Sequence, residues 1–168
     1  MKYLIIILLV LLLFILFKVI ILPSIMKATC KKKIMQCLQR VDNISFLNGK
    51  TIDEDLKIRV DDQVFYFKIL LCPSNCDLQI NNIETWGIYK NGKFTYINDI
   101  KKFINSQESN KIVVLASKAH TIKKVINECE MIMVDENVDV YNSLVINYDK
   151  INLLNEIVKK RCKNHHFN

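Results

Sequence analysis

The sequence predicts one membrane-spanning helix followed by a small α/β domain, in which antiparallel strands precede a βαβ unit within one mixed sheet. Three observations predict this fold class. An unbroken apolar run opens the chain, alternating segments separated by turn signals fill residues 56–97, and short continuous apolar runs flank a helical pattern between residues 112 and 134. The part of the chain after the apolar run, about 125 residues, is long enough to bury one hydrophobic core.

The apolar run from Tyr3 to Leu22 is 20 residues long. A helix of that length spans roughly 30 Å, which matches the hydrocarbon core of a bilayer. Lys18 interrupts the run near its end, where the ammonium group reaches the lipid headgroups while the aliphatic stem stays in lipid. Pro23 is expected to stop or bend the helix, because it lacks an N–H donor.

A cleaved signal peptide is the alternative to a retained anchor. Its apolar core would be about 7–15 residues long and would end at small residues of the Ala-x-Ala type. The run here is longer, and Pro23-Ser24-Ile25-Met26 offers no such cleavage site. We therefore expect residues 3–22 to remain as a transmembrane helix.

Residues 23–40 are predicted to form a basic juxtamembrane helix with a thin apolar stripe at Ile34, Leu38 and Cys37. The residues that give this segment its charge are Lys27, Lys31, Lys32, Lys33 and Arg40, with no acid before Asp42. Basic residues next to a span tend to stay in the cytoplasm, so residues 41–168 are expected on the cytoplasmic face of the cell membrane. The lysines of residues 27–33 also attract anionic headgroups.

The net charge of +7 belongs to the anchor. Residues 1–40 carry seven Lys and Arg and no acid, so residues 41–168 carry 17 basic and 17 acidic residues. Phosphate contacts dominate nucleic-acid affinity, and a neutral domain lacks the electrostatic surface that makes them. We therefore do not expect nucleic acid as a partner.

Residues 56–97 show the alternation of half-buried strands and the turn signals between them. The most central strand should be Val64–Cys72, which is rich in aromatic and β-branched residues. Asn91-Gly92 predicts a tight hairpin. The expected strands are Leu56–Val60, Val64–Cys72, Leu78–Ile80, Glu84–Tyr89 and Phe94–Ile97.

Residues 98–168 predict helices and buried strands in alternation. Asn98 or Asp99 caps a helix with Ile100, Phe103 and Ile104 on one face. The βαβ unit is expected to consist of the strand Ile112–Ala116, a helix over His120–Cys129 and the strand Met131–Val134, with Cys129 in the core. Leu144–Ile146 is expected as an edge strand, and Asp149 as the cap of a last helix with Leu153, Leu154, Ile157 and Val158 inward.

The cysteines allow a zinc site in principle. Cys72 and Cys76 could supply one half, and Cys162 and His165 the other. These spacings are permissible without being diagnostic, and the second pair lies in the last seven residues, which usually fray. Cytoplasmic thiols are expected to be reduced, and we predict no bound cofactor.

The order of elements over residues 27–135 resembles the restriction-endonuclease-like fold, including the nuclease-related domain of some bacterial membrane proteins. In that family an Asp at a strand end and a Glu-x-Lys on the next strand hold a divalent metal, Mg²⁺ or Mn²⁺, and position the attacking water. The counterparts implied here are Asp77 and Glu84. Trp86 stands where the lysine should be, so the motif is degenerate and we interpret Glu84 as a solvated strand residue.

Other polar residues favour structural roles. Asp135, Glu136 and Asp139 follow a short strand, where open α/β sheets often bind ligands, but a polar loop is the simpler interpretation. His120 is expected to be exposed and structural, and Trp86 to pack in the core.

Two hypotheses of different classes remain. The first is a membrane-tethered, non-catalytic interaction domain with an unknown protein partner. The second is a membrane-anchored, metal-dependent nuclease. The neutral domain and the missing lysine favour the first, because nothing in the degenerate motif activates a nucleophile.

Overall fold

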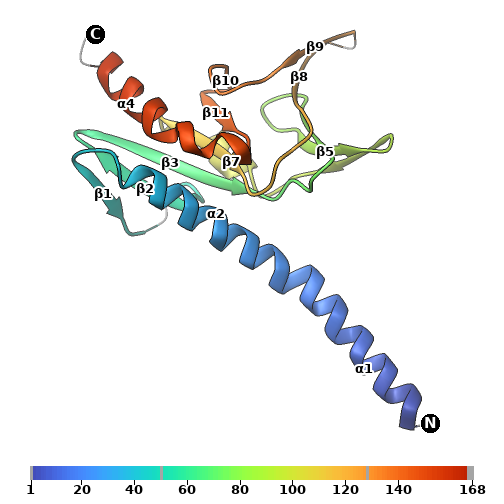
Figure 1. Ribbon diagram of the computed structural model, residues 1–168. Helices are drawn as coiled ribbons and strands as arrows, with labels where there is room; N and C mark the ends of the chain where they lie inside the picture. The colour runs from blue at the N-terminus through green and yellow to red at the C-terminus, as the bar shows by residue number, and fades with distance from the viewer. Residues whose placement is uncertain (1, 50, 128, 166–168) are drawn as a thin grey trace.

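The computed structural model describes residues 2–49, 51–127 and 129–165. One long apolar N-terminal helix leads into a mixed-sheet α/β domain, which confirms the predicted fold class at that level (Figure 1). The domain contains two sheets, and a pair of helices covers the outer face of the larger one.

The N-terminal helix is continuous from the first described residue into the domain. It comprises α1 (Lys2–Leu16), a π-helical turn η1 (Phe17–Ile21) and α2 (Leu22–Leu38), which together form a helical rod. Of the two outcomes predicted for Pro23, a stop is wrong, because α2 runs through it. The Leu22 N–H donates to the Phe17 carbonyl five residues earlier, and this wider turn accommodates the missing donor of Pro23. The apolar part of the rod is long enough to cross a membrane.

The larger sheet has six strands, and its central strands are parallel. The parallel strands β3, β7 and β11 are extended by antiparallel strands on both sides. All five residues of β7 are buried, as expected for a strand covered on both faces. The spatial order is β1 (Ile44–Leu47), β2 (Leu56–Val60), β3 (Gln63–Leu70), β7 (Lys111–Leu115), β11 (Ser143–Ile146) and β10 (Asp139–Val140).

The smaller sheet has five strands and ends in two hairpins. Only β4 and β8 are parallel within it. The predicted Asn91-Gly92 hairpin is confirmed, and both residues have positive φ, 49° and 77°, as a tight turn of this kind requires. The spatial order is β6 (Lys93–Tyr96), β5 (Trp86–Lys90), β4 (Asp77–Ile80), β8 (Ile122–Asn127) and β9 (Glu130–Met133).

The predicted helix over His120–Cys129 is wrong, and so is the βαβ unit built on it. Residues 122–127 form β8, which pairs with β4 on one side and with β9 on the other. Ile122, Val125 and Ile126 fit a helical spacing, but β-branched side chains favour extended backbone once a partner strand is present. Cys129, predicted in the core, is exposed at the turn before β9.

The last third of the chain needs two further corrections. Leu144–Ile146 is not an edge strand, because β11 lies between β7 and β10. The last helix is a 3₁₀ turn η2 (Tyr148–Leu153) that continues into α4 (Leu154–His165). Its cap is Asn147, whose side chain accepts from the Tyr148 N–H, whereas Asp149 pairs with Lys118.

The helices and the two sheets form layers. Cys30, Ile34 and Leu38 of α2 pack with α4 against one face of the six-stranded sheet, so the predicted apolar stripe of the juxtamembrane segment is part of the core. The opposite face packs against the five-stranded sheet and against the single-turn helix α3 (Lys101–Ile104). Strand β3 serves both layers, since Phe67 faces the helices and Tyr66 faces the second sheet.

Candidate functional site

The two carboxylates of the degenerate motif do not meet. Asp77 begins β4 opposite Tyr89, whereas Ile80 at the other end of β4 pairs with Trp86. Glu84 lies in the loop beyond that far end and is exposed, instead of standing on a strand as predicted. Three residues of strand, roughly 10 Å, therefore separate Asp77 from the end of the pair near Glu84. The geometry does not assemble the metal site that the resemblance implies.

Asp77 instead forms a charge cluster with β8 and the loop before it. Its carboxylate lies 2.8 Å from Lys123 Nζ and 3.1 Å from His120 Nδ1. Burial alone would raise the pKa of Asp77, but its hydrogen bonds, led by the one from Lys123, outweigh burial and lower that pKa to about 2. The His120 side chain is 73% exposed, as predicted. Among the described residues no Ser, Thr or Cys side chain hydrogen-bonds to His120, so the pair is not part of a nucleophile–base dyad of the Ser–His or Cys–His kind.

A crevice of about 340 Å³ opens beyond the carboxyl ends of the parallel strands β7 and β11. This is where open α/β sheets commonly bind ligands. Four of its charged groups form ion pairs, Lys118 with Asp149 at 2.9 Å and Lys150 with Glu136 at 3.4 Å, and Asp135 accepts a hydrogen bond from the Asn137 N–H. The hydrogen bond from Lys118 holds the pKa of Asp149 below its ordinary value. Of the acids predicted to form a polar loop, Glu136 pairs with Lys150 at this crevice, whereas Asp139 pairs with Arg161 outside it.

The three cysteines of the possible zinc site are not gathered. Cys72 and Cys76 are buried between the two sheets, whereas Cys162 is buried on the helix side of the larger sheet. The side chain of His165 lies outside the described residues. Burial raises the pKa of the Cys72 thiol to about 12, so this cysteine stays protonated at neutral pH.

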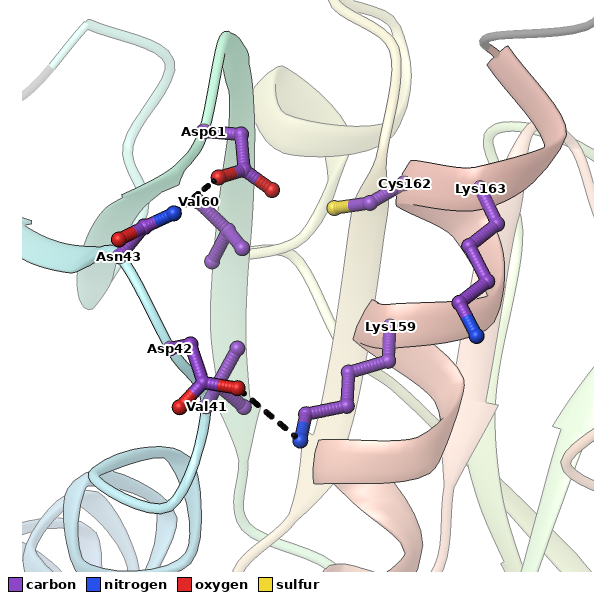
Figure 2. A pocket seen from close by; sticks show the side chains of 8 residues that line it. All are labelled: Val41, Asp42, Asn43, Val60, Asp61, Lys159, Cys162 and Lys163. Carbon is purple, nitrogen blue, oxygen red and sulfur yellow. Dashed lines mark hydrogen bonds and ion pairs between the residues drawn. The ribbon is translucent and has the colours of Figure 1, made fainter.

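A second pocket, of about 290 Å³, lies between the end of α4 and the loops at the far end of the rod (Figure 2). Lys159 pairs with Asp42 at 3.7 Å, and Asn43 donates to Asp61 at 2.8 Å. Burial, together with the charge of Asp61, raises the pKa of the Cys162 thiol that faces the pocket. Its two acids, Asp42 and Asp61, are engaged, and burial disfavours the thiolate form of Cys162.

The β8–β9 hairpin exposes apolar side chains that the sequence predicted to be buried. Met131, Ile132 and Met133 are 58%, 37% and 62% exposed, and Ile126 on β8 is 49% exposed. All four residues of β9 are exposed, so neither face of this strand is covered within the described chain. Among the described strands β9 pairs only with β8, which leaves its outer backbone groups open. An exposed apolar edge strand is the feature of this domain best suited to bind another polypeptide.

The sequence could not distinguish this strand from a core strand. Its three apolar side chains have the composition of a buried strand, and exposure depends on which elements cover it. Two methionines in one short strand, Met131 and Met133, are a weak signal, because flexible Met side chains recur at adaptable binding surfaces.

The predicted membrane-flanking lysines lie along the rod. Lys18 Nζ lies 4.6 Å from the centre of the Phe14 ring, within the apolar part. Lys27 pairs with Asp99, and Lys33 lies over the Tyr148 ring at 4.0 Å, so these two also tie α2 to the domain. Lys31 and Lys32 are exposed.

Comparisons of the chain with protein-family models, with curated proteins and with solved structures found no match, so its functional assignment rests on the geometry described above.

Proposed function

We propose that the chain is a single-pass protein of the cell membrane whose cytoplasmic domain is a non-catalytic interaction module. The open edge of β9 (Glu130–Met133), here called the β9 edge, binds an extended segment of a partner protein as an additional strand. The observation that carries this proposal is the exposure of every β9 side chain on a strand with one free edge. The ion pairs in the crevice and the separation of Asp77 from Glu84 favour binding over catalysis.

The cytoplasmic orientation of the domain is inferred from the basic residues that follow the span. It is tested in intact cells with a membrane-impermeant thiol reagent, and Cys129 is the suitable reporter because it is exposed. Cys162 is unsuitable because it is buried. Cys129 should become labelled only after permeabilisation, and a Cys129→Ser variant gives the background. Ready labelling of Cys129 in intact cells would place the domain outside.

A partner strand would bind through the backbone first. The Val134 N–H donates to the Ile122 carbonyl at 2.9 Å, toward β8. Because successive residues of a strand point in opposite directions, the Met133 N–H points away from β8 into the open edge. Exposed side chains on both faces of β9 then supply apolar contacts.

Charge favours a partner over a second copy of this chain. Residues 130–136 carry three acids and no basic residue, so a self-pairing of β9 brings the acids of both copies to the same short edge; the antiparallel pairing centred on Met133, for example, sets Glu130 of each copy opposite Glu136 of the other. Like charges directly opposite each other destabilise a strand pair. The same carboxylates attract a partner segment whose apolar residues are flanked by Lys or Arg.

The test uses the full chain in lipid nanodiscs and a short fluorescent peptide of alternating valine and threonine with lysine at both ends. We expect binding, measured by fluorescence anisotropy, at least about tenfold tighter than for the same peptide with glutamate ends. Met133→Pro should abolish binding because it removes the outward donor, whereas the control Met133→Val retains both the donor and the affinity.

Circular dichroism of each variant confirms that the domain remains folded. Equal binding of both peptides, or full binding by folded Met133→Pro, would contradict strand addition at the β9 edge. A concentration-dependent dimer that dissociates in Met133→Pro would instead identify a second copy as the occupant.

A further inference from the structure

The hairpin of β5 and β6 carries three aromatic side chains on its outer face. Gly87 pairs with Tyr96, and Tyr89 pairs with Phe94, so these four residues share one face of the sheet. Trp86, on the opposite face, is fully buried. The Phe94 and Tyr96 rings meet edge to face at 5.0 Å. We call Tyr89, Phe94 and Tyr96 the aromatic face.

Gly87 makes the arrangement possible. The Phe94 ring lies across its backbone, and a Cβ atom at Gly87 would come within 2.3 Å of that ring. The tip of the Phe94 ring therefore occupies the space over the Gly87 backbone that any other side chain would fill. Tyr89 is 41% exposed and Tyr96 is 66% exposed.

Lysines lie at both ends of this hairpin: Lys90 and Lys93 pair at its tip, on the face opposite to Tyr89, and Lys101 and Lys102 follow β6. This basic rim consists of Lys90, Lys93, Lys101 and Lys102, all exposed. The one acid between residues 85 and 104, Asp99, is engaged by Lys27. The surface is thus locally positive, although residues 41–168 as a whole are neutral.

The rod fixes the height of this surface above the membrane. Lys27 Nζ lies 3.4 Å from the Asp99 carboxylate. Lys27 is five residues beyond Leu22, about 8 Å along the helix from the end of the apolar run. The headgroup layer on each side of a bilayer is roughly 5–8 Å thick. Asp99, with Tyr96 before it and Lys101 after it, therefore lies at headgroup level, and Figure 1 shows the β5 hairpin extending to the same side of the domain as α1.

Resting on the proposed membrane anchorage, we propose that the aromatic face and the basic rim form a second membrane contact. Tyr89 and Tyr96 lie among the headgroups, where amphipathic rings are favoured, and the basic rim binds the phosphates of anionic lipids. Together with the rod this contact holds the domain against the bilayer in one orientation and leaves the β9 edge open. Single-stranded nucleic acid also stacks on aromatic side chains beside lysines. The position of the surface at the end of the span favours lipid.

The test uses the full chain in nanodiscs of phosphatidylcholine, with or without phosphatidylserine, and photo-crosslinking benzoylphenylalanine in place of Tyr96. We expect lipid adducts by mass spectrometry, several-fold more abundant with phosphatidylserine. The matched control places the crosslinker at Asp62, an exposed residue of the β2–β3 turn. The hydrogen bond between Asn43 and Asp61 ties that turn to the end of α2, about 24 Å beyond Leu22, so no adduct is expected there.

A triple variant, Lys93→Glu, Lys101→Glu and Lys102→Glu, should lose the dependence on phosphatidylserine and keep the embedded rod. Absence of adducts at position 96 in nanodiscs that retain the protein would overturn the second contact and leave the anchor intact. Equal adducts at both positions would overturn it as well. A chain that fails to stay in the nanodisc at all would overturn the anchorage and with it this contact. Preferential crosslinking to added oligothymidine would identify the surface as a nucleic-acid site and reject the lipid assignment.

Discussion

The six-stranded and the five-stranded sheets differ in how they are covered. Helices α2 and α4 cover one face of the larger sheet and the smaller sheet covers the other, so β3 and β7 are buried on both sides. The smaller sheet packs through one face only, and its outer hairpins expose Tyr96 and Met133. We therefore expect the larger sheet to contribute most of the stability, whereas the smaller sheet exposes apolar surface.

Polar side chains are also buried in the larger sheet and in the loop beside it. Lys111 in β7 is 1% exposed, and its ammonium donates to the carbonyls of Ile104 and Ser106 at 2.6 and 2.9 Å. Glu54 is equally buried, and its carboxylate accepts from the Thr51 and Ile52 N–H groups. A polar group can be buried there because hydrogen bonds replace the lost water.

The largest expected effect comes from breaking the larger sheet. Phe67→Ala removes a fully buried ring between β3 and α2, and should lower the free energy of unfolding by about 3–5 kcal/mol. Urea unfolding of the full chain in detergent, followed by the fluorescence of the single tryptophan, Trp86, measures it. The matched variant Ile132→Ala on exposed β9 should change it by under about 0.5 kcal/mol. Similar losses in both variants would show that β9 is covered in the folded chain.

An intermediate effect is expected at the base of β4. Hydrogen bonds lower the pKa of Asp77 from its ordinary 3.8 to about 2, so the charged carboxylate stabilises the fold above pH 4. That contribution is lost as the pH falls from about 4 to about 2. Because water reaches the cluster, we expect it to be about 1 kcal/mol. Asp77→Asn should be less stable than wild type at pH 7, and the difference should vanish near pH 2 in urea titrations. A difference that is constant with pH would show that the ion pairs do not carry it.

The smallest effect is expected at Glu84. This carboxylate is exposed in a loop and distant from Asp77, so Glu84→Gln should alter stability by under about 0.5 kcal/mol. Millimolar Mg²⁺ or Mn²⁺ should leave the melting temperature unchanged in both proteins. A metal-dependent rise in Tm that disappears in Glu84→Gln would restore the nuclease hypothesis.

Local patterns predicted the elements whose environment is itself local. Neighbours within a few residues determine each of these elements: the apolar run of the span, the alternation of β2, the aromatic-rich β3 and the Asn91-Gly92 turn. The prediction that Trp86 packs in the core is confirmed, and it rests on local signals because Trp86 stands on a strand between two turns.

Elements whose environment comes from distant parts of the chain were not predictable. The segment 122–127 has a periodicity compatible with a helix, and it becomes β8 because β4, more than forty residues earlier, offers it a parallel partner. The pairing of Asp77 with His120, 43 residues apart, arises from the same contact. The two carboxylates that the resemblance pairs, Asp77 and Glu84, lie apart because a short separation in sequence does not mean proximity when a strand runs between them.

The sequence by itself determined that this chain begins with an apolar helix, that basic residues follow it and that an α/β domain comes next. These properties depend on composition and on short-range periodicity. Only the tertiary structure decided which apolar residues are covered. Ile112 and Ile132 have the same side chain in similar strands, but β7 lies between two layers and β9 at a free edge. Burial depends on the elements that pack against a strand, and those elements come from distant parts of the chain.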